Sequence, residues 1–164
     1  MKGGGHATNP KFSSTSGVQI ALSRFNETKV NVTSGTVEIG AGLTWDQVYV
    51  ALEPTGVNVV GGRTPGIGVA GLTLGGGECF DLRRATRSQV SRGYSYLSSQ
   101  YGLALDNVVG YELVLPNGTV MSVTSEDDDL WFGLRVSRQV QYKLAFLMVS
   151  NCREVSIISY AISL

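Results

Sequence analysis

The most informative segment of this 164-residue sequence is Gly61-Gly-Arg-Thr-Pro-Gly-Ile-Gly-Val-Ala-Gly-Leu-Thr-Leu-Gly-Gly-Gly77. Eight of its seventeen residues are glycine, and apolar residues such as Ile67 and Leu74 stand between them. Flexible linkers are rich in glycine but polar, so we expect this apolar segment to pack within the fold. Bare glycine backbone permits close approach of a large flat ligand or of another backbone segment. Ligand binding and tight sheet-to-helix packing are both consistent with this pattern.

A second glycine cluster, Lys2-Gly-Gly-Gly-His6, opens the chain. Successive glycine N–H groups can converge on phosphate oxygens, although a flexible terminal tail is the simpler alternative. Neither cluster is the dinucleotide-binding fingerprint of a Rossmann fold. Gly66-x-Gly68-x-x-Gly71 has the spacing, but it lacks the βαβ context and the acidic residue about 20 positions later.

The composition excludes several classes of protein. Thirteen basic and thirteen acidic residues balance, which argues against nucleic-acid binding through a broad basic field. With 43% hydrophobic and 16% charged residues, the chain can bury a core. Two cysteines and one histidine are too few for a disulfide framework or a thiolate metal site. The longest apolar run, residues 144–149, is too short to span a membrane. We therefore expect no metal, no nucleic-acid partner and no membrane partner.

Periodicity and turn signals predict a mixture of strands and helices. Strands are expected at residues 18–22, 28–32, 36–39, 57–60, 111–115 and 119–123, with hairpin turns at 33–35 and 116–118. A helix is expected from Thr44, where Gln47 completes a capping box, and it ends near Pro54 and Gly56. Ser125 is expected to cap a second helix whose first turn is the acidic run 126–129. The fold class is α+β.

Several motifs in a fixed order carry a family resemblance. They are Gly3–His6, 64–77, 94–108, 112–118 and 129–134. In this order they resemble the FAD-binding domain of flavin-linked oxidases of the vanillyl-alcohol-oxidase fold, and especially fungal proteins similar to berberine bridge enzyme. The resemblance implies a partial FAD-binding domain over residues 1–135, truncated at both ends, with two small α+β subdomains and antiparallel or mixed sheets.

The same resemblance implies which residues contact the cofactor. These are Gly3, Gly4, Gly5, His6, Thr64, Pro65, Gly66, Gly68, Gly71, Leu72, Gly75, Gly76, Asn107 and Val108. The first glycine loop would bind the FAD pyrophosphate, and His6 would be joined covalently to the flavin 8α-methyl carbon. Thr64 stands where some members have a second linking cysteine, so we expect one link only. The simpler alternatives are a surface histidine at His6 and an ordinary turn at 106–107. No catalytic residue is assigned.

Members of this family oxidise an alcohol, a carbohydrate or an alkaloid by hydride transfer to FAD, often with dioxygen as the acceptor. Their substrate pocket lies mostly in a domain C-terminal to this one. The resemblance therefore implies FAD and, in the intact parent, a small-molecule substrate as partners. Two rival hypotheses are a non-catalytic remnant and a glycine-rich structural module without a cofactor.

Two segments depart from the family pattern. Residues 78–92 interrupt the glycine segment with four arginines, and 136–164 follow a helix without a matching turn. The codons for 77–79 and for 136–137 can both spell GTGAGT, a common start of an intron. We therefore hypothesise that 78–92 is a retained intron and that 136–164 is read-through. On this hypothesis the insert is poorly packed and the tail lacks defined partners.

Three N-glycosylation motifs begin at Asn26, Asn31 and Asn117. They favour secretion for a full-length parent. Because this sequence opens without a signal peptide, we expect the chain as written to stay inside the cell.

Overall fold

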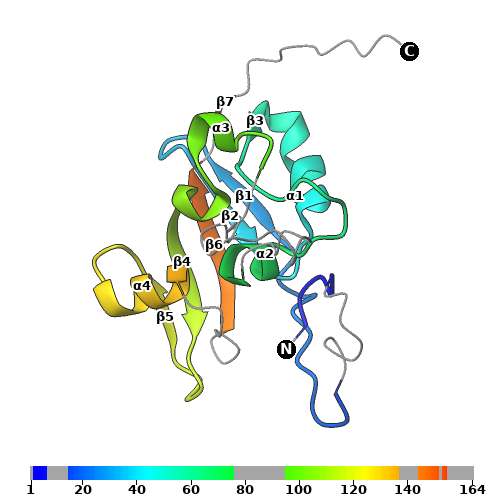
Figure 1. Ribbon diagram of the computed structural model, residues 1–164, viewed down its shortest axis with the longest axis vertical. Coiled ribbons are helices and arrows are strands. Elements are labelled where there is room, and N and C mark those ends of the chain that lie inside the picture. Colours follow the sequence, from blue (N-terminus) through cyan, green and yellow to red (C-terminus); the bar gives the residue numbers. More distant parts are fainter. Residues whose placement is uncertain (1, 7–14, 76–94, 137–143, 152, 155–164) are drawn as a thin grey trace, which may run out of the picture.

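The computed structural model describes residues 2–6, 15–75, 95–136, 144–151 and 153–154 (Figure 1). Its elements, in chain order, are β1 (Thr28–Asn31), β2 (Thr36–Gly40), α1 (Trp45–Leu52), η1 (Glu53–Thr55), β3 (Val57–Asn58), α2 (Val69–Gly75), α3 (Ser98–Tyr101), η2 (Ala104–Asn107), β4 (Val108–Val114), β5 (Val120–Val123), α4 (Asp128–Val136), β6 (Leu144–Asn151) and β7 (Arg153–Glu154). Gly76 and the suspected insert 78–92 lie outside the described residues.

The described strands form two antiparallel sheets. The larger has the order β1-β2-β6-β4-β5, so two hairpins flank β6, and the smaller pairs β3 with β7. Helix α1 packs against the larger sheet, and α4 lies beside the β4–β5 hairpin (Figure 1). The expected α+β class with antiparallel sheets is confirmed.

Both predicted hairpins form. In β2, Val37 and Ile39 are fully buried while Glu38 between them is not, as alternation requires. In the second hairpin, the N–H of Leu115 donates to the Thr119 carbonyl at 2.9 Å across the turn. β4 begins three residues earlier than predicted, at Val108, because its first residues pair with β6.

Helix α1 starts where its capping box predicts. The N–H of Thr44 donates to Oε1 of Gln47 at 3.0 Å, and Trp45, Val48 and Leu52 are buried on one face. After Leu52 the chain tightens into η1 and turns at Gly56, whose φ is +69°. This helix places its N-terminus next to the glycine segment.

The strand predicted at 18–22 is wrong. The segment makes a single parallel bridge, between Lys2 and Ala21, and Val18 is 92% exposed. An apolar run between turn signals predicts a buried strand, but here most of the side chains lie outside the core, so the segment stays extended at the surface. The strand predicted at 57–60 is shorter, since β3 covers only Val57–Asn58.

The N-terminus of α4 also differs from the prediction. The helix begins at Asp128, and Ser125 does not cap it. Instead, the N–H of Thr124 donates to Oδ2 of Asp127 at 3.0 Å, which closes a turn before the helix. Asp128 and Asp129 still stand in the first helical turn, where the helix dipole favours acidic groups.

The C-terminal segment differs from the prediction that 136–164 lack defined partners. Strand β6, within that segment, is the central strand of the larger sheet. Its residues pair with β2 on one side and β4 on the other, so Met148 lies opposite both Ile39 and Tyr111. A continuous apolar run such as 144–149 suits a strand paired on both edges, and without it each hairpin would present an unpaired edge.

Candidate functional site

The two glycine clusters meet backbone to backbone. A Cβ built on Gly4 would lie 2.7 Å from the Cα of Gly68, and a Cβ on Gly68 would lie 2.6 Å from the nitrogen of Gly4. Real Cβ atoms do not approach other atoms this closely, so both positions require glycine. Segments 64 residues apart are thereby joined into one two-loop cradle, which we define as residues 3–6 and 64–68.

Backbone hydrogen bonds fix each loop of the cradle. In the first, the N–H of Lys2 donates to the Ile20 carbonyl at 2.8 Å and the N–H of Leu22 donates to the Lys2 carbonyl at 2.9 Å. In the second, the N–H of Trp45 donates to the Ile67 carbonyl and the N–H of Val69 to the Leu43 carbonyl, both at 2.9 Å. The start of α1 therefore holds the second loop.

Asp46 adds another contact between α1 and the second loop. Its Oδ1 accepts a hydrogen bond from the N–H of Gly66 at 2.8 Å. This hydrogen bond lowers the pKa of the Asp46 carboxyl below its usual value. The sequence analysis missed Asp46 because an acidic residue in a first helical turn is explained by the helix dipole alone.

The first part of the glycine segment serves packing. Gly61 and Gly62 lie directly on the indole of Trp45, and any Cβ there would overlap the ring. The hydroxyl of Tyr49 donates to the Gly62 carbonyl at 3.0 Å, and burial raises the pKa of Tyr49 to about 12. Gly61 and Gly62 thus fit the packing alternative, and ligand binding at Gly66 and Gly68, which build the cradle, stays a prediction.

The cradle offers backbone donors. The N–H groups of Gly3, Gly4 and Gly5 make no hydrogen bond to any residue that the structure describes, and the same holds for Gly68. Clustered N–H groups in glycine loops are a recurrent anion site, so the residues present fit a pyrophosphate.

His6 stands at the edge of the cradle. Its ring Cδ2 lies 4.0 Å from the position of a Cβ on Gly66, and it is exposed, as are Thr64 and Pro65. The structure therefore brings His6, Thr64, Pro65 and Gly66 to one surface. The imidazole is accessible to a ligand that occupies the cradle.

The predicted contact residues in α2 differ in their surroundings. Gly71 is exposed, with open space where its Cβ would be, whereas Leu72 packs in the hydrophobic core. A ligand contact at Leu72 would thus involve its backbone. Gly75 ends α2.

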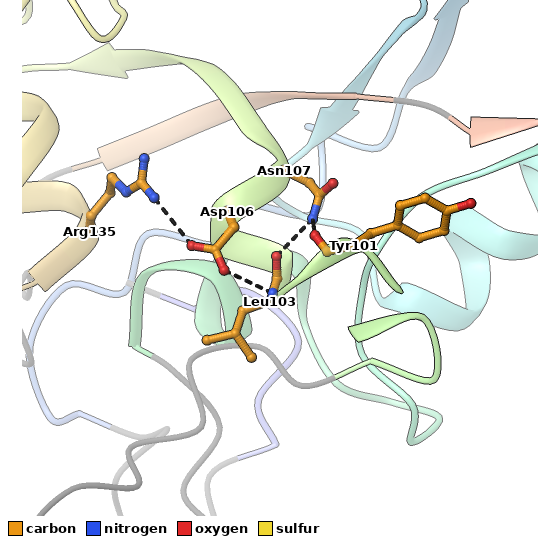
Figure 2. Close-up of polar contacts among 5 residues, drawn as sticks. All are labelled: Tyr101, Leu103, Asp106, Asn107 and Arg135. Carbon is orange, nitrogen blue, oxygen red and sulfur yellow. Dashed lines mark hydrogen bonds and ion pairs between the residues drawn. The ribbon is translucent and has the colours of Figure 1, made fainter. Parts of the chain in front are cut away.

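Asn107 ends η2, which packs against α2, and Val108 is the first residue of β4. Figure 2 shows that Nδ2 of Asn107 donates to the carbonyls of Tyr101 and Leu103, both at 2.9 Å. Asn107 and Val108 are 2% and 3% exposed. The amide N–H groups of Asn107 thus serve the turn itself, which favours the structural alternative, and the cofactor contact stays a prediction.

An ion pair fastens this turn to α4. Nη2 of Arg135 lies 3.3 Å from Oδ1 of Asp106, and Oδ2 of the same carboxylate accepts a hydrogen bond from the N–H of Leu103 at 2.9 Å (Figure 2). The guanidinium also lies over the Trp131 ring, 5.5 Å from its centroid. The turn before β4 is therefore held by its own hydrogen bond between Leu103 and Asp106 and by the ion pair with α4.

Within the described part of the chain, no three His, Cys, Asp or Glu side chains gather closely enough to hold a metal ion. The helices of that part are also too short or too polar to cross a bilayer.

An α+β domain whose two glycine loops form a cradle of backbone donors has the features of an anion-binding domain, and comparison with known proteins identifies its family. Residues 1–124 match the family model described as FAD binding domain, and the chain belongs to this family of FAD-binding oxidoreductases. The expected vanillyl-alcohol-oxidase type of fold and the FAD cofactor are thereby confirmed.

Individual relatives agree with this assignment. The FAD-dependent monooxygenase FUP4 of Fusarium proliferatum is 39% identical over 137 residues, which are 82% of this chain and 23% of that protein. Among solved structures, BBE-like 1 of Physcomitrella patens superimposes with a TM-score of 0.66 at 28% identity, over 82% of this chain and 26% of the other. Glucooligosaccharide oxidase from Acremonium strictum has a TM-score of 0.73 at 22% identity, over 93% of this chain and 29% of the other, and shows the fold alone. The chain spans about a quarter of the length of these relatives.

Proposed function

We propose that the two-loop cradle binds the pyrophosphate of FAD through the backbone N–H groups of Gly3, Gly4, Gly5 and Gly68. The observation that carries this proposal is the backbone contact between Gly4 and Gly68, which closes the cradle and leaves these N–H groups without a partner among the described residues. A cradle of amides can hold a dianion without a basic side chain.

His6 is the residue proposed to hold the flavin covalently. Its imidazole is exposed and adjacent to Gly66, so a ring nitrogen can act as the nucleophile toward a flavin held at the cradle. The link would replace one hydrogen of the 8α-methyl group by the ring nitrogen, a two-electron oxidation for which dioxygen is the acceptor. Because Thr64 carries no thiol, we propose one link at most.

For the whole protein we propose oxidation of a small alcohol, carbohydrate or alkaloid-like substrate. Bound FAD supplies the hydride acceptor, and dioxygen is the proposed terminal acceptor. The residues of this chain bind and orient the cofactor. We assign the substrate pocket to the part of the protein that corresponds to the relatives' sequence beyond this chain. Binding of FAD without turnover is therefore the expected behaviour of the 164-residue chain by itself.

The test is to incubate the chain with FAD, denature it in acid and measure the flavin absorbance that stays with the polypeptide. We expect retained flavin in the wild type, none in His6→Ala, and wild-type retention in the control Gly17→Ala, which lies outside the cradle and has room for a Cβ. Retention by His6→Ala would contradict a histidyl link. A wild type that binds FAD reversibly but retains none would contradict the link and leave the cradle in place.

A further inference from the structure

Asp46 differs from the other polar residue at the start of α1. Gln47 caps the helix through the N–H of Thr44, which is the usual task of a residue at its position. The carboxylate of Asp46 has a local hydrogen bond with the Thr44 side chain and also accepts one from the N–H of Gly66, 20 residues further along the sequence. The second bond holds the loop that contains Gly66.

The loop that Asp46 holds is the one that shapes the cradle. Gly66 has a φ of +78°, a left-handed conformation that turns the chain toward the first loop. Its carbonyl oxygen lies 3.2 Å from the position of a Cβ on Gly4. The Trp45 N–H bond to the Ile67 carbonyl fixes the next residue, so Gly66 and Ile67 are held from the same helix end.

We propose that Asp46 is a positioning residue for the FAD pyrophosphate, which it affects by holding Gly66 and with it the second loop of the cradle. The inference rests on the proposed function of the cradle. Two effects of Asp46 oppose each other: its hydrogen bond orders the loop, whereas its negative charge repels an anion nearby. A hydrogen bond to a charged acceptor outweighs the repulsion of exposed, solvent-screened charges, so the ordering effect dominates.

Two substitutions separate these effects. Asp46→Asn keeps an acceptor oxygen for Gly66 and removes the charge, whereas Asp46→Ala removes both. Asp127→Ala is the matched control, because Asp127 also accepts one backbone N–H bond, from Thr124 at 3.0 Å, but stands in the turn before α4. The dissociation constant for FAD is measured by fluorescence titration of each full chain, after circular dichroism has established that it folds.

We expect Asp46→Ala to bind FAD about tenfold more weakly than the wild type. Asp46→Asn is expected to bind as tightly as the wild type or more tightly, and Asp127→Ala to be unchanged. Equal affinities in the alanine and asparagine variants would overturn the proposal, because charge alone would then account for Asp46. A wild type without FAD affinity would overturn the proposed function itself and the positioning role with it.

A second measurement does not depend on the variants folding. Amide hydrogen exchange in the wild-type chain should be slow at Gly66, whose N–H is bonded, and fast at Gly3, whose N–H has no partner among the described residues. Slow exchange at Gly66 supports the contact, and exchange as fast as at Gly3 overturns it.

Discussion

Tyr49 ties helix α1 to the glycine segment through a single hydroxyl group. Its hydrogen bond to the Gly62 carbonyl fixes the backbone just where Gly62 crosses Trp45. Removing the hydroxyl leaves a partly buried carbonyl without its donor, a loss of about 1 kcal/mol. Tyr49→Phe is therefore expected to lower the free energy of unfolding by about that amount at pH 7, measured by urea denaturation.

The same hydroxyl makes a pH-dependent contribution. The pKa of Tyr49 is raised from 10 to about 12 by burial, so the folded state favours the neutral form. Its stabilisation is full below pH 10 and is lost as the pH rises toward 12. The difference between wild type and Tyr49→Phe should narrow over that interval, and a difference that stays constant to pH 12 would contradict the assignment.

Residue patterns predicted local features of the site and missed its long-range contacts. Capping and periodicity placed Trp45 and Val48 correctly on the buried face of a helix. The partnership of Asp46 with Gly66 joins two segments through backbone geometry, and no periodicity in either segment encodes it. The role of Gly61 and Gly62 became clear only with the indole beneath them.

Helix α1 supports the site from the core side, and two valines of the same helix test this. Val48 is fully buried, whereas Val50 is 69% exposed. Val48→Ala removes two buried carbon atoms and leaves a cavity, so the free energy of unfolding should fall by about 2 kcal/mol. Val50→Ala should change it by less than about 0.5 kcal/mol. Equal effects in chemical denaturation would show that α1 is not packed as described.

Strand β6 is the element that sequence analysis judged most incorrectly. Hairpins are predictable because their partners are adjacent and the turn residues specify the pairing. A central strand that pairs with β2 and β4 has partners 30 or more residues away, and its apolar run alone does not indicate which strands those are.

Hydrogen exchange tests the place of β6 directly. Because its backbone is paired on both sides, peptides covering 144–151 should exchange as slowly as those covering β4 at 108–114, and β1 at the sheet edge should exchange faster. Mass spectrometry of pepsin fragments gives these rates. Rapid exchange over 144–151 would contradict the pairing of β6 and support the unpaired tail that the read-through hypothesis predicts.

At the level of the whole molecule, the motif order predicted the family and cofactor, while the origin of two segments stays a proposal. We propose that 78–92 is a retained intron, because its removal makes the family-like run from Gly76 to Tyr94 continuous through one glycine. Transcript reads across this junction should include the spliced form. Reads that keep both 78–92 and the codons after 135 as the dominant message would contradict the proposal.

The three glycosylation asparagines, Asn26, Asn31 and Asn117, are all exposed. Their side chains are accessible for glycan attachment, which supports the proposal that a full-length parent is secreted. A glycosylated full-length parent in the culture medium is the expected result, and a full-length parent retained inside the cell would contradict the proposal.

The cradle is closed by one contact, the approach of Gly4 to Gly68. Gly68→Ala would put a Cβ 2.6 Å from the Gly4 nitrogen, whereas Gly17→Ala, the same substitution, meets its nearest atom at an ordinary 3.6 Å. FAD titration of the wild type and both variants is therefore the most direct test. We predict that Gly68→Ala binds FAD at least about tenfold more weakly and that Gly17→Ala binds like the wild type. Undiminished binding by Gly68→Ala would contradict the cradle as the FAD site.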